Sequence, residues 1–556
     1  MNNTIKYFAA ATAIVLATSS CNDVLDINDT STFGDVAVWS SQDNADAYVT
    51  AAYKSFNDQS IVANRDKFYD NYSDIMKSPY WWIGTYNRAL FEQSRFGKGN
   101  ADLFDCWSSV YGRIKRTNAM LNDLERYGHK WGDEWYEIRR AEGRFCNAIN
   151  YFYLARVYGG VVLRTDHSGG GGWLDDGAYE QDRNRARISE EATYEYILNE
   201  LKDVAKVLPE EWPAAWTGRA TRGMAYAFIS RIALYAKNWE LAVSAADECA
   251  KYYSLVPDYA KLFDVSSGQD NSKEIIFGIR FQKNVLSHGF DTDYRPFGDR
   301  LVYGNQVLAN SQPTAELVDM YEFNDGTEFD WNTYSTNHAD PYTDREPRFH
   351  ATVLYNGAKW EGRTIETFEG GSDSFRTFSI SEDADGHTVT GYYLRKYLQE
   401  GNSTFPTEGS YNTDIIIRYA EVLLNKAEAL AQLNRLSDAM EPLNEVRRRV
   451  NLPDRTFTAA MSLDDFMTIL RKERCVELAG EGHRIWDLRR WRMAEGVING
   501  KNVHGHKATR NGTSFEYTTV DADGGSKRIF LPHYYYLSLP SGELSQNSLC
   551  VDNAGW

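Results

Sequence analysis

The chain has 556 residues, of which 42% are hydrophobic and 25% are charged. These proportions are typical of a folded globular protein with a large buried core. A net charge of −18 repels phosphate backbones, so nucleic acid is excluded as the expected partner, whereas a neutral carbohydrate meets no such repulsion.

The N-terminus has the pattern of an export signal. Lys6 precedes an apolar run at residues 8–17, and small polar residues lead to Cys21. The run is too short to span a bilayer, which needs roughly 20 residues. Residues 16–21 resemble the lipobox of bacterial lipoproteins, in which the cysteine becomes the first residue and carries acyl chains that hold the protein to a membrane. We therefore predict a signal peptide at 1–20 and lipidation at Cys21; the alternative is an ordinary secretory signal with a chance cysteine.

The remaining chain predicts a mainly α, single-domain protein from residue 21 to 556. The expected helices pair as 43–56 with 103–127, 134–158 with 191–208, 220–236 with 239–252, and two helices within 414–450. Small residues such as Ala225, Ala242 and Ala246 permit close helix crossings, and the turns at 237–238 and 434–435 are short. About four such hairpins predict a TPR-like scaffold, in which each pair buries its apolar face on a neighbour.

Two stretches break the helical pattern. Residues 57–100 and 253–412 are rich in Gly, Asp, Asn and aromatic residues, with short alternating runs at 274–281 and 391–398 that predict strands. Stretches this long without helical periodicity are uncommon unless they serve a function. We expect them to form a loop-rich ligand layer on the helical scaffold.

The cysteines after residue 21 predict neither a disulfide framework nor a zinc site. They are five in number and have no CxxC spacing, so they cannot all pair within the chain. Most fall in helical patterns, where a buried thiol behaves as a small apolar side chain. These residues are Cys106, Cys146, Cys249, Cys475 and Cys550.

Four separated segments resemble the SusD/RagB family. They are DVLD at 23–26, RAEGRF leading to RVYGGV at 140–161, IRYAEVLL leading to GHRIWDLRRW at 417–491, and LPSGEL with the final Gly-Trp at 539–556. The resemblance implies a TPR-rich glycan-binding lipoprotein at the cell surface of the outer membrane. It also implies delivery of oligosaccharides or polysaccharides to a SusC-like TonB-dependent transporter, and it implies no catalysis.

Aromatic residues are the best candidates for ligand contact, because the apolar C–H face of a pyranose packs on a flat ring. The family resemblance places such rings in the loop before the helix at 103–127 and in the segment after the 274–281 strand. The candidate ligand-binding residues are Asp74, Tyr80, Trp81, Trp82, Tyr294, Arg300, Tyr303 and Trp331. Asp74 and Arg300 are included because they can bond sugar hydroxyls; the alternative for each ring is packing within the layer.

We predict no catalytic residue, metal or cofactor. His483 and Asp487 stand one helical turn apart, but the neighbouring arginines favour an ion-pair network with Glu473 and Glu477 over a metal or acid–base site. The chain has no GxSxG, HExxH or P-loop motif. Two alternatives stay open: a RagB-type subunit that binds peptide or protein, and a surface polysaccharide hydrolase that uses paired carboxylates.

Overall fold

The computed structural model describes residues 35–59, 68–81, 86–165, 184–268 and 272–556. The predicted signal peptide, Cys21 and Trp82 lie outside these ranges. Within them, none of the helices is long and apolar enough to cross a membrane.

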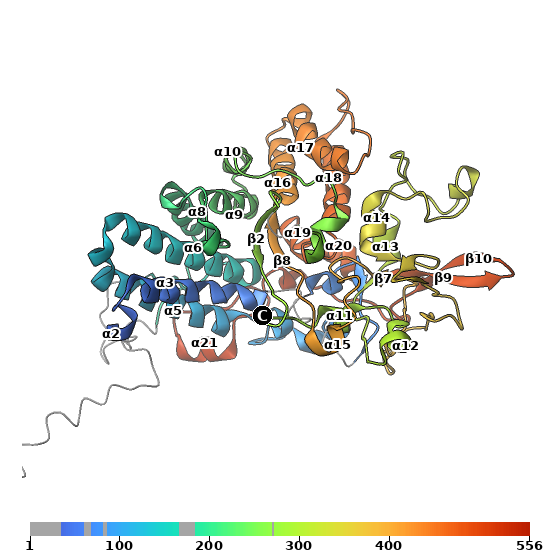
Figure 1. The fold of residues 1–556 in the computed structure, drawn as a ribbon, viewed down its shortest axis with the longest axis horizontal. Coiled ribbons are helices and arrows are strands. Elements are labelled where there is room, and N and C mark those ends of the chain that lie inside the picture. Colours follow the sequence, from blue (N-terminus) through green and yellow to red (C-terminus); the bar gives the residue numbers. More distant parts are fainter. Residues whose placement is uncertain (1–34, 60–67, 82–85, 166–183, 269–271) are drawn as a thin grey trace, which may run out of the picture.

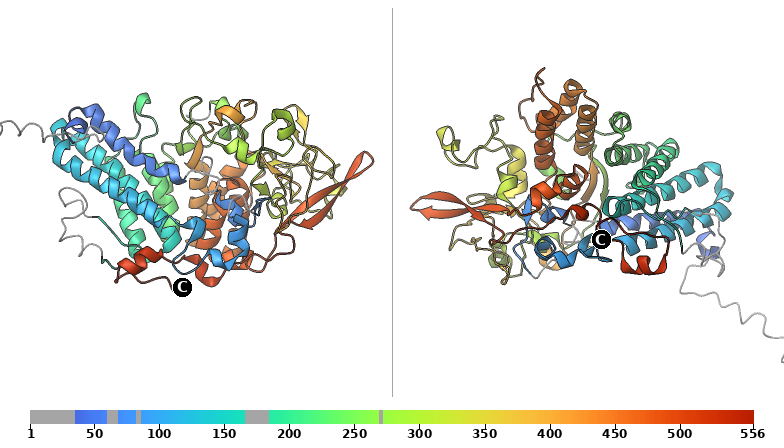
Figure 2. Two further views of the ribbon diagram at one scale, coloured as in Figure 1. Left: turned by 90° about the horizontal axis from the view of Figure 1, so that it is seen from below. Right: turned by 180° about the vertical axis from the view of Figure 1, so that it is seen from behind.

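The protein is mainly α, as predicted. In Figures 1 and 2 the helices occupy one side of the molecule and irregular chain occupies the other. The helices are α2 (Asp35–Val38), α3 (Gln42–Thr50), α4 (Tyr86–Phe91), α5 (Trp107–Tyr127), α6 (Asp133–Tyr158), α8 (Glu190–Val207), α9 (Arg222–Tyr235), α10 (Trp239–Cys249), α11 (Phe290–Tyr294), α12 (Asp299–Tyr303), α13 (Ala315–Val318), α14 (Pro347–Thr352), α15 (Phe405–Glu408), α16 (Tyr419–Gln432), α17 (Leu436–Arg449), α18 (Leu463–Leu478), α19 (Arg484–Arg490), α20 (Ala494–Ile498) and α21 (Ser541–Gln546).

The long helices stack in chain order. α5 packs on α6, α6 on α8, α8 on α9, α9 on α10, α10 on α16, and α16 on α17. The crossing of α9 and α10 buries Ala225, Ala242 and Ala246, which confirms the expected close approach. The first residue of each predicted turn, Lys237 and Asn434, adopts a left-handed backbone conformation that reverses the chain within two residues.

Two predicted helical segments differ from the structure. The segment predicted at 43–56 is α helical only in α3 and continues as the 3-10 helix η1 (Ala51–Gln59). The first five residues of the predicted 414–450 segment form strand β8, because the run Ile415–Ile417 is β-branched and pairs with β2. β8 leads directly into α16 and so ties the loop layer to the scaffold.

Within the described residues the strands form five two-stranded, antiparallel pairs. They are β1 (Met76–Lys77) with β3 (Gln312–Pro313), β2 (Ile275–Ile279) with β8 (Asp414–Arg418), β4 (Val353–Leu354) with β7 (Tyr393–Leu394), β5 (Lys359–Trp360) with β6 (Arg363–Thr364), and β9 (His504–Asn511) with β10 (Ser514–Asp521). β2 and β7 fall within the predicted strands at 274–281 and 391–398.

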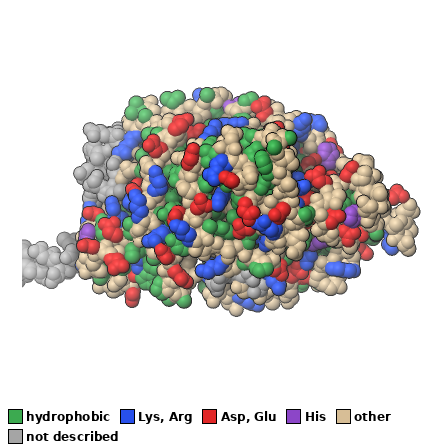
Figure 3. Space-filling model, turned by 90° about the horizontal axis from the view of Figure 1, so that it is seen from above, with side chains coloured by type: hydrophobic (Ala, Val, Ile, Leu, Met, Phe, Trp, Pro, Cys, Tyr) green, Lys and Arg blue, Asp and Glu red, His purple; other side chains and the backbone are tan. Residues whose placement is uncertain are grey.

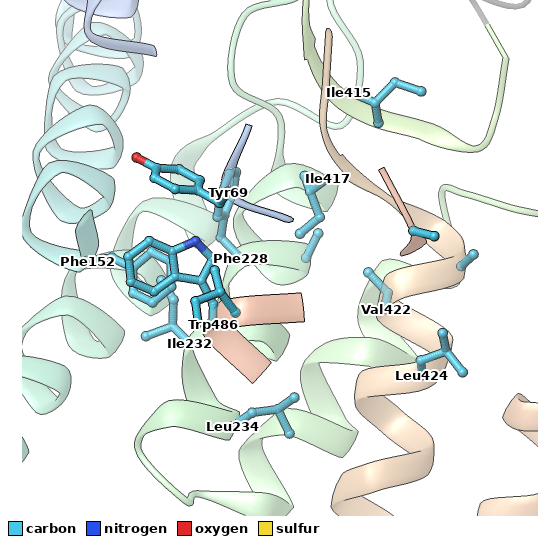
Figure 4. Packing of buried hydrophobic residues seen from close by; sticks show 14 of the residues in the cluster. Tyr69, Phe152, Phe228, Ile232, Leu234, Ile415, Ile417, Val422, Leu424 and Trp486 are labelled. Atoms are coloured by element: carbon cyan, nitrogen blue, oxygen red, sulfur yellow. The ribbon is translucent and has the colours of Figure 1, made fainter. Parts of the chain in front are cut away.

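One hydrophobic cluster joins the two sides. Figure 4 shows side chains of α6, α9, β8 and α16 meeting there, with Tyr69 and Trp486 nearby. The rings of Tyr69 and Trp486 meet edge to face, with centroids 5.3 Å apart. Tyr69 belongs to the segment 57–100, which the sequence predicts as part of the loop-rich ligand layer, yet every residue from 68 to 81 is buried. This part of the predicted ligand layer is therefore core.

Candidate functional site

The loop-rich layer rests on a buried arginine. The Arg295 side chain is fully buried; its Nε donates to Asp291 Oδ1 at 2.7 Å and its Nη1 to Glu361 Oε2 at 2.7 Å. Nη2 donates to the Gln399 carbonyl at 2.7 Å. Asp291 precedes Arg295 by one helical turn, and Glu361 and Gln399 come from distant loops. Arg295 therefore fixes the positions of α11 and of two loops beside it.

A second buried network holds α12. Arg363 donates to Asp299 Oδ1 at 2.6 Å and to Asp373 Oδ2 at 2.6 Å, and the Trp360 indole N–H also reaches Asp299. Burial raises the pKa of Asp299, and Arg363 and Arg295 oppose that rise. Asp299 and Arg295 thus have structural roles, and they present the neighbouring Arg300 on a rigid base.

Arg300 is partly exposed and gathers groups from three parts of the chain. Its Nη2 and Nε bond the Val307 carbonyl at 2.8 and 3.0 Å, and its Nη1 donates to Asp385 Oδ2 at 2.9 Å. The Tyr80 hydroxyl lies 3.5 Å from Nη2. The guanidinium carbon lies 4.8 Å from the centroid of the Phe297 ring. The Arg300 guanidinium, the exposed Asp385 carboxylate and the Phe297 ring therefore meet at one surface.

Phe297 is paired with a histidine that the sequence analysis did not single out. The Phe297 ring stacks on His387, with centroids 3.8 Å apart, and both side chains are partly exposed. Burial lowers the pKa of His387, which favours the neutral ring. Asp385 and His387 lie in the loop SEDADGH at 381–387, where a run of polar residues around a glycine was the available signal.

Trp81 packs against the 381–387 loop that carries Asp385 and His387. Its backbone N–H donates to Asp383, and its ring stacks on Phe91 at 6.1 Å. It forms a small apolar cluster with Phe378, Ala384 and Val389. The side chain is 9% exposed, so Trp81 supports the 381–387 loop and shows only an edge to solvent.

Tyr303 and Trp331 are partly exposed but belong to different neighbourhoods. The Tyr303 hydroxyl donates to Glu361, and its ring meets Phe405 edge to face at 5.1 Å. Burial and Glu361 raise the pKa of Tyr303 to about 12. The Trp331 indole N–H donates to Asp319 at 2.9 Å, and its ring packs on His506 of β9. Tyr303 lies in α12 close to Arg300, whereas Trp331 packs against the β9–β10 hairpin.

Asp74, Tyr80 and Tyr294 are corrected from ligand contacts to structural residues. Asp74 is buried and forms a bidentate pair with Arg484 at 2.7 and 2.8 Å. Burial alone would raise the pKa of Asp74, but Arg484 holds it below its usual value. Tyr294 is 0% exposed and packs between Phe68 and Phe290, and Tyr80 is 1% exposed. The partners of all three side chains lie within the protein, which accounts for their burial.

The segment at 482–491 forms an ion-pair network through Asp487, as predicted, but Glu473 and Glu477 pair with other arginines, such as Arg348. Asp487 accepts from Arg474 at 2.6 Å and from Arg490 at 2.9 Å, and Arg490 also bonds Glu428. Burial lowers the pKa of His483 to about 4. Over the ranges that the structure describes, no three His, Cys, Asp or Glu side chains are grouped so as to hold a metal ion. The five later cysteines are buried, as predicted, and within the described ranges they form no disulfide with one another.

A cavity of about 440 Å³ lies on the helical side, away from the predicted rings. α8, the α9–α10 turn, α19 and the segment 535–536 line it, and none of the predicted ligand-binding residues does. Figure 3 shows acidic and basic side chains intermingled over one face of the molecule. Because Arg300 and the other predicted ligand-binding residues do not line the cavity, the cavity and the Arg300 surface are two separate candidate sites.

Comparisons with known proteins agree with the fold. Residues 273–556 match the model of the SusD family, and residues 23–234 match a family described as starch-binding, associating with the outer membrane. A SusD-like protein of Formosa agariphila is 23% identical, with 87% of this chain and 89% of that protein covered.

Two crystal structures from Bacteroides fragilis are similar to this one. A SusD-like protein is 26% identical with a TM-score of 0.77, and 94% of this chain and 98% of that one are covered. A SusD-like carbohydrate-binding protein is 25% identical with a TM-score of 0.75, with 92% and 99% covered. The family match spans more than half of the chain, the order of helices and loops is shared over nearly all of it, and the chain therefore belongs to the SusD family.

Proposed function

We propose that this protein binds oligosaccharides at the cell surface and passes them to a SusC-like TonB-dependent transporter, without chemically altering them. The observation that carries the proposal is the surface around Arg300, where a fixed guanidinium, the exposed Asp385 carboxylate and the Phe297–His387 ring pair meet. Sugars need such a mixture, because their C–H faces pack on rings while their hydroxyls seek directional donors and acceptors.

The family supports this proposal. The model matched by residues 23–234 is described as starch-binding, and one of the similar crystal structures is named a carbohydrate-binding protein. The description of an association with the outer membrane fits an acyl anchor at Cys21. Replacing Cys21 with alanine should release the protein from membranes, and copurification from outer membranes would identify the transporter.

The binding site can be tested by calorimetric titration with a panel of neutral oligosaccharides. We expect Arg300→Ala to weaken binding of the preferred glycan at least about tenfold, since a charge-assisted bond to a hydroxyl contributes roughly 1.5–3 kcal/mol. Arg448→Ala is the matched control, because Arg448 also forms an exposed pair with a carboxylate, on the helical scaffold. Trp81→Ala combined with Trp82→Ala tests the two tryptophans that the sequence predicts as ligand contacts.

The same experiments separate the alternatives. If no oligosaccharide binds and peptides copurify with the protein, the subunit is of the peptide-binding type and the proposal fails. If the pure protein releases reducing sugar from a polysaccharide, it is a hydrolase. If the Arg300→Ala and Arg448→Ala variants bound a glycan with equal affinity, the binding site would lie elsewhere than at the Arg300 surface.

A further inference from the structure

The cavity on the helical side contains a buried arginine that the ion-pair network does not neutralise. Arg489 lines it and is 6% exposed. Its Nη2 donates to the Tyr535 carbonyl at 2.7 Å, but its Nε is buried without a hydrogen-bond partner. Within the described ranges, no carboxylate lies within ion-pair distance of Arg489. A buried guanidinium in this state is costly unless a ligand completes its bonds.

The other two arginines of α19 differ from Arg489, because both are paired with carboxylates. Arg484 is paired with Asp74, and Arg490 is paired with Glu428 and Asp487. Although burial by itself lowers the pKa of Arg490, these carboxylates raise it above the usual value. Burial is the main reason that the pKa of Arg489 is lowered to about 10, and the nearby Arg492 and Arg156 contribute in the same direction. Arg489 therefore lies in a positive potential that favours an anion.

The other residues that line the cavity limit which anions it can bind. Among the described residues, six basic and three acidic side chains line it, on a chain whose net charge is −18. The acidic ones, Glu190, Glu191 and Glu195, all lie on the first turns of α8, and they disfavour ligands that carry many negative charges. Five aromatic residues of the described chain also line it: Tyr194, Tyr235, Trp486, Tyr535 and Tyr536.

We propose that this cavity binds a uronic acid, a sugar whose carboxylate is bonded by Arg489 while its ring packs on the aromatic wall. Arginine matches a carboxylate with two parallel N–H donors, and aromatic rings suit the C–H face of a sugar. A volume of about 440 Å³ is within the range of small-molecule sites. Asn199 and Asn238 at the exposed margin are placed to bond ring hydroxyls. This site is distinct from the Arg300 surface and does not depend on it.

Calorimetric titration with glucuronate, glucose and acetate tests the proposal. We expect glucuronate to bind at least about tenfold more tightly than either glucose, which lacks the carboxylate, or acetate, which lacks the ring. Arg489→Gln should weaken glucuronate binding at least about tenfold, and Arg489→Lys, which keeps the charge, should retain part of it.

Two further variants test whether a loss of glucuronate binding comes from this cavity, and not from misfolding of the Arg489 variant or from the Arg300 surface. Leu241→Trp narrows the cavity from the partly exposed surface of α10 and should also weaken glucuronate binding. Arg300→Ala should leave it unchanged. Glucose or acetate binding as tightly as glucuronate would overturn the assignment, and so would glucuronate binding that survives both Arg489→Gln and Leu241→Trp. Loss with Arg300→Ala alone would place the uronate in the loop layer, which overturns this proposal and leaves the proposed function intact.

Discussion

The helical scaffold and the loop-rich layer are stabilised in different ways. In the scaffold, helices satisfy their own backbone groups, and contacts such as Ala242 and Ala246 of α10 against α9 bury small apolar side chains. In the layer the backbone is irregular, and charged side chains bond the backbone instead. The Arg345 guanidinium, which is buried, donates to the carbonyls of Val318, Tyr321 and Pro341. Where regular backbone pairing is lacking, buried side chains satisfy the polar groups.

This difference predicts that the layer depends on single buried charges. Replacing Arg295 with methionine leaves Asp291, Asp299 and Glu361 without their shared partner. Breaking a buried ion pair on one side typically costs about 3–5 kcal/mol, so we expect a large drop in the chemical unfolding midpoint.

Arg300→Met is the matched control for that change. Its carboxylate partner Asp385 is more than half exposed, so water can replace that bond. The buried Val307 carbonyl also loses its two donors, so we expect a loss of about 1–3 kcal/mol, less than for Arg295→Met. If the two variants unfolded at the same denaturant concentration, the layer would not depend on its buried charges as the structure indicates.

A smaller effect should follow from His288, also in the layer. Its Nε2 bonds the Asn412 carbonyl at 3.0 Å and its Nδ1 accepts the Phe290 N–H at 3.3 Å, so the neutral ring satisfies both partners. Burial lowers its pKa to about 4 from the usual 6.5. Because the pKa is depressed in the folded protein, the stability it contributes is complete above pH 6.5 and is lost as the pH falls toward 4. The loss at pH 5 is about 2 kcal/mol.

Urea unfolding at pH 7 and pH 5 measures this dependence. His288→Gln should be less stable than the wild type at pH 7 but should lose less stability between the two pH values. His129→Gln is the control, because His129 is half exposed on the scaffold. An unchanged pH dependence in His288→Gln would show that other groups cause the acid sensitivity.

The scaffold was easier to predict from the sequence than the site. The pairs α9–α10 and α16–α17 are encoded by local periodicity and short turns, which a single sequence displays. Asp74 was mistaken for a ligand contact because its partner Arg484 is 410 residues away. Arg300, Tyr80 and Asp385 meet only after folding, and the predicted ion pairs at 482–491 gave no sign that Arg489 would differ from Arg490. Long-range partners decide whether a polar residue is structural or exposed, and periodicity does not report them.

The smallest predicted effect concerns two glycines on neighbouring scaffold helices. A Cβ at Gly112 in α5 would meet nothing within 4 Å, whereas one at Gly143 in α6 would lie 2.7 Å from Met120 Cε and 2.8 Å from Leu121 Cδ2. Alanine lowers the entropy of the unfolded chain, so Gly112→Ala should stabilise the protein by about 0.5–1 kcal/mol. Gly143→Ala has the same gain, but crowding between α5 and α6 costs about 1–3 kcal/mol, so we expect a net loss of about 1 kcal/mol. Thermal unfolding of the two variants should therefore shift in opposite directions. Equal shifts would mean that α5 and α6 separate without cost, and that their close packing does not stabilise the scaffold.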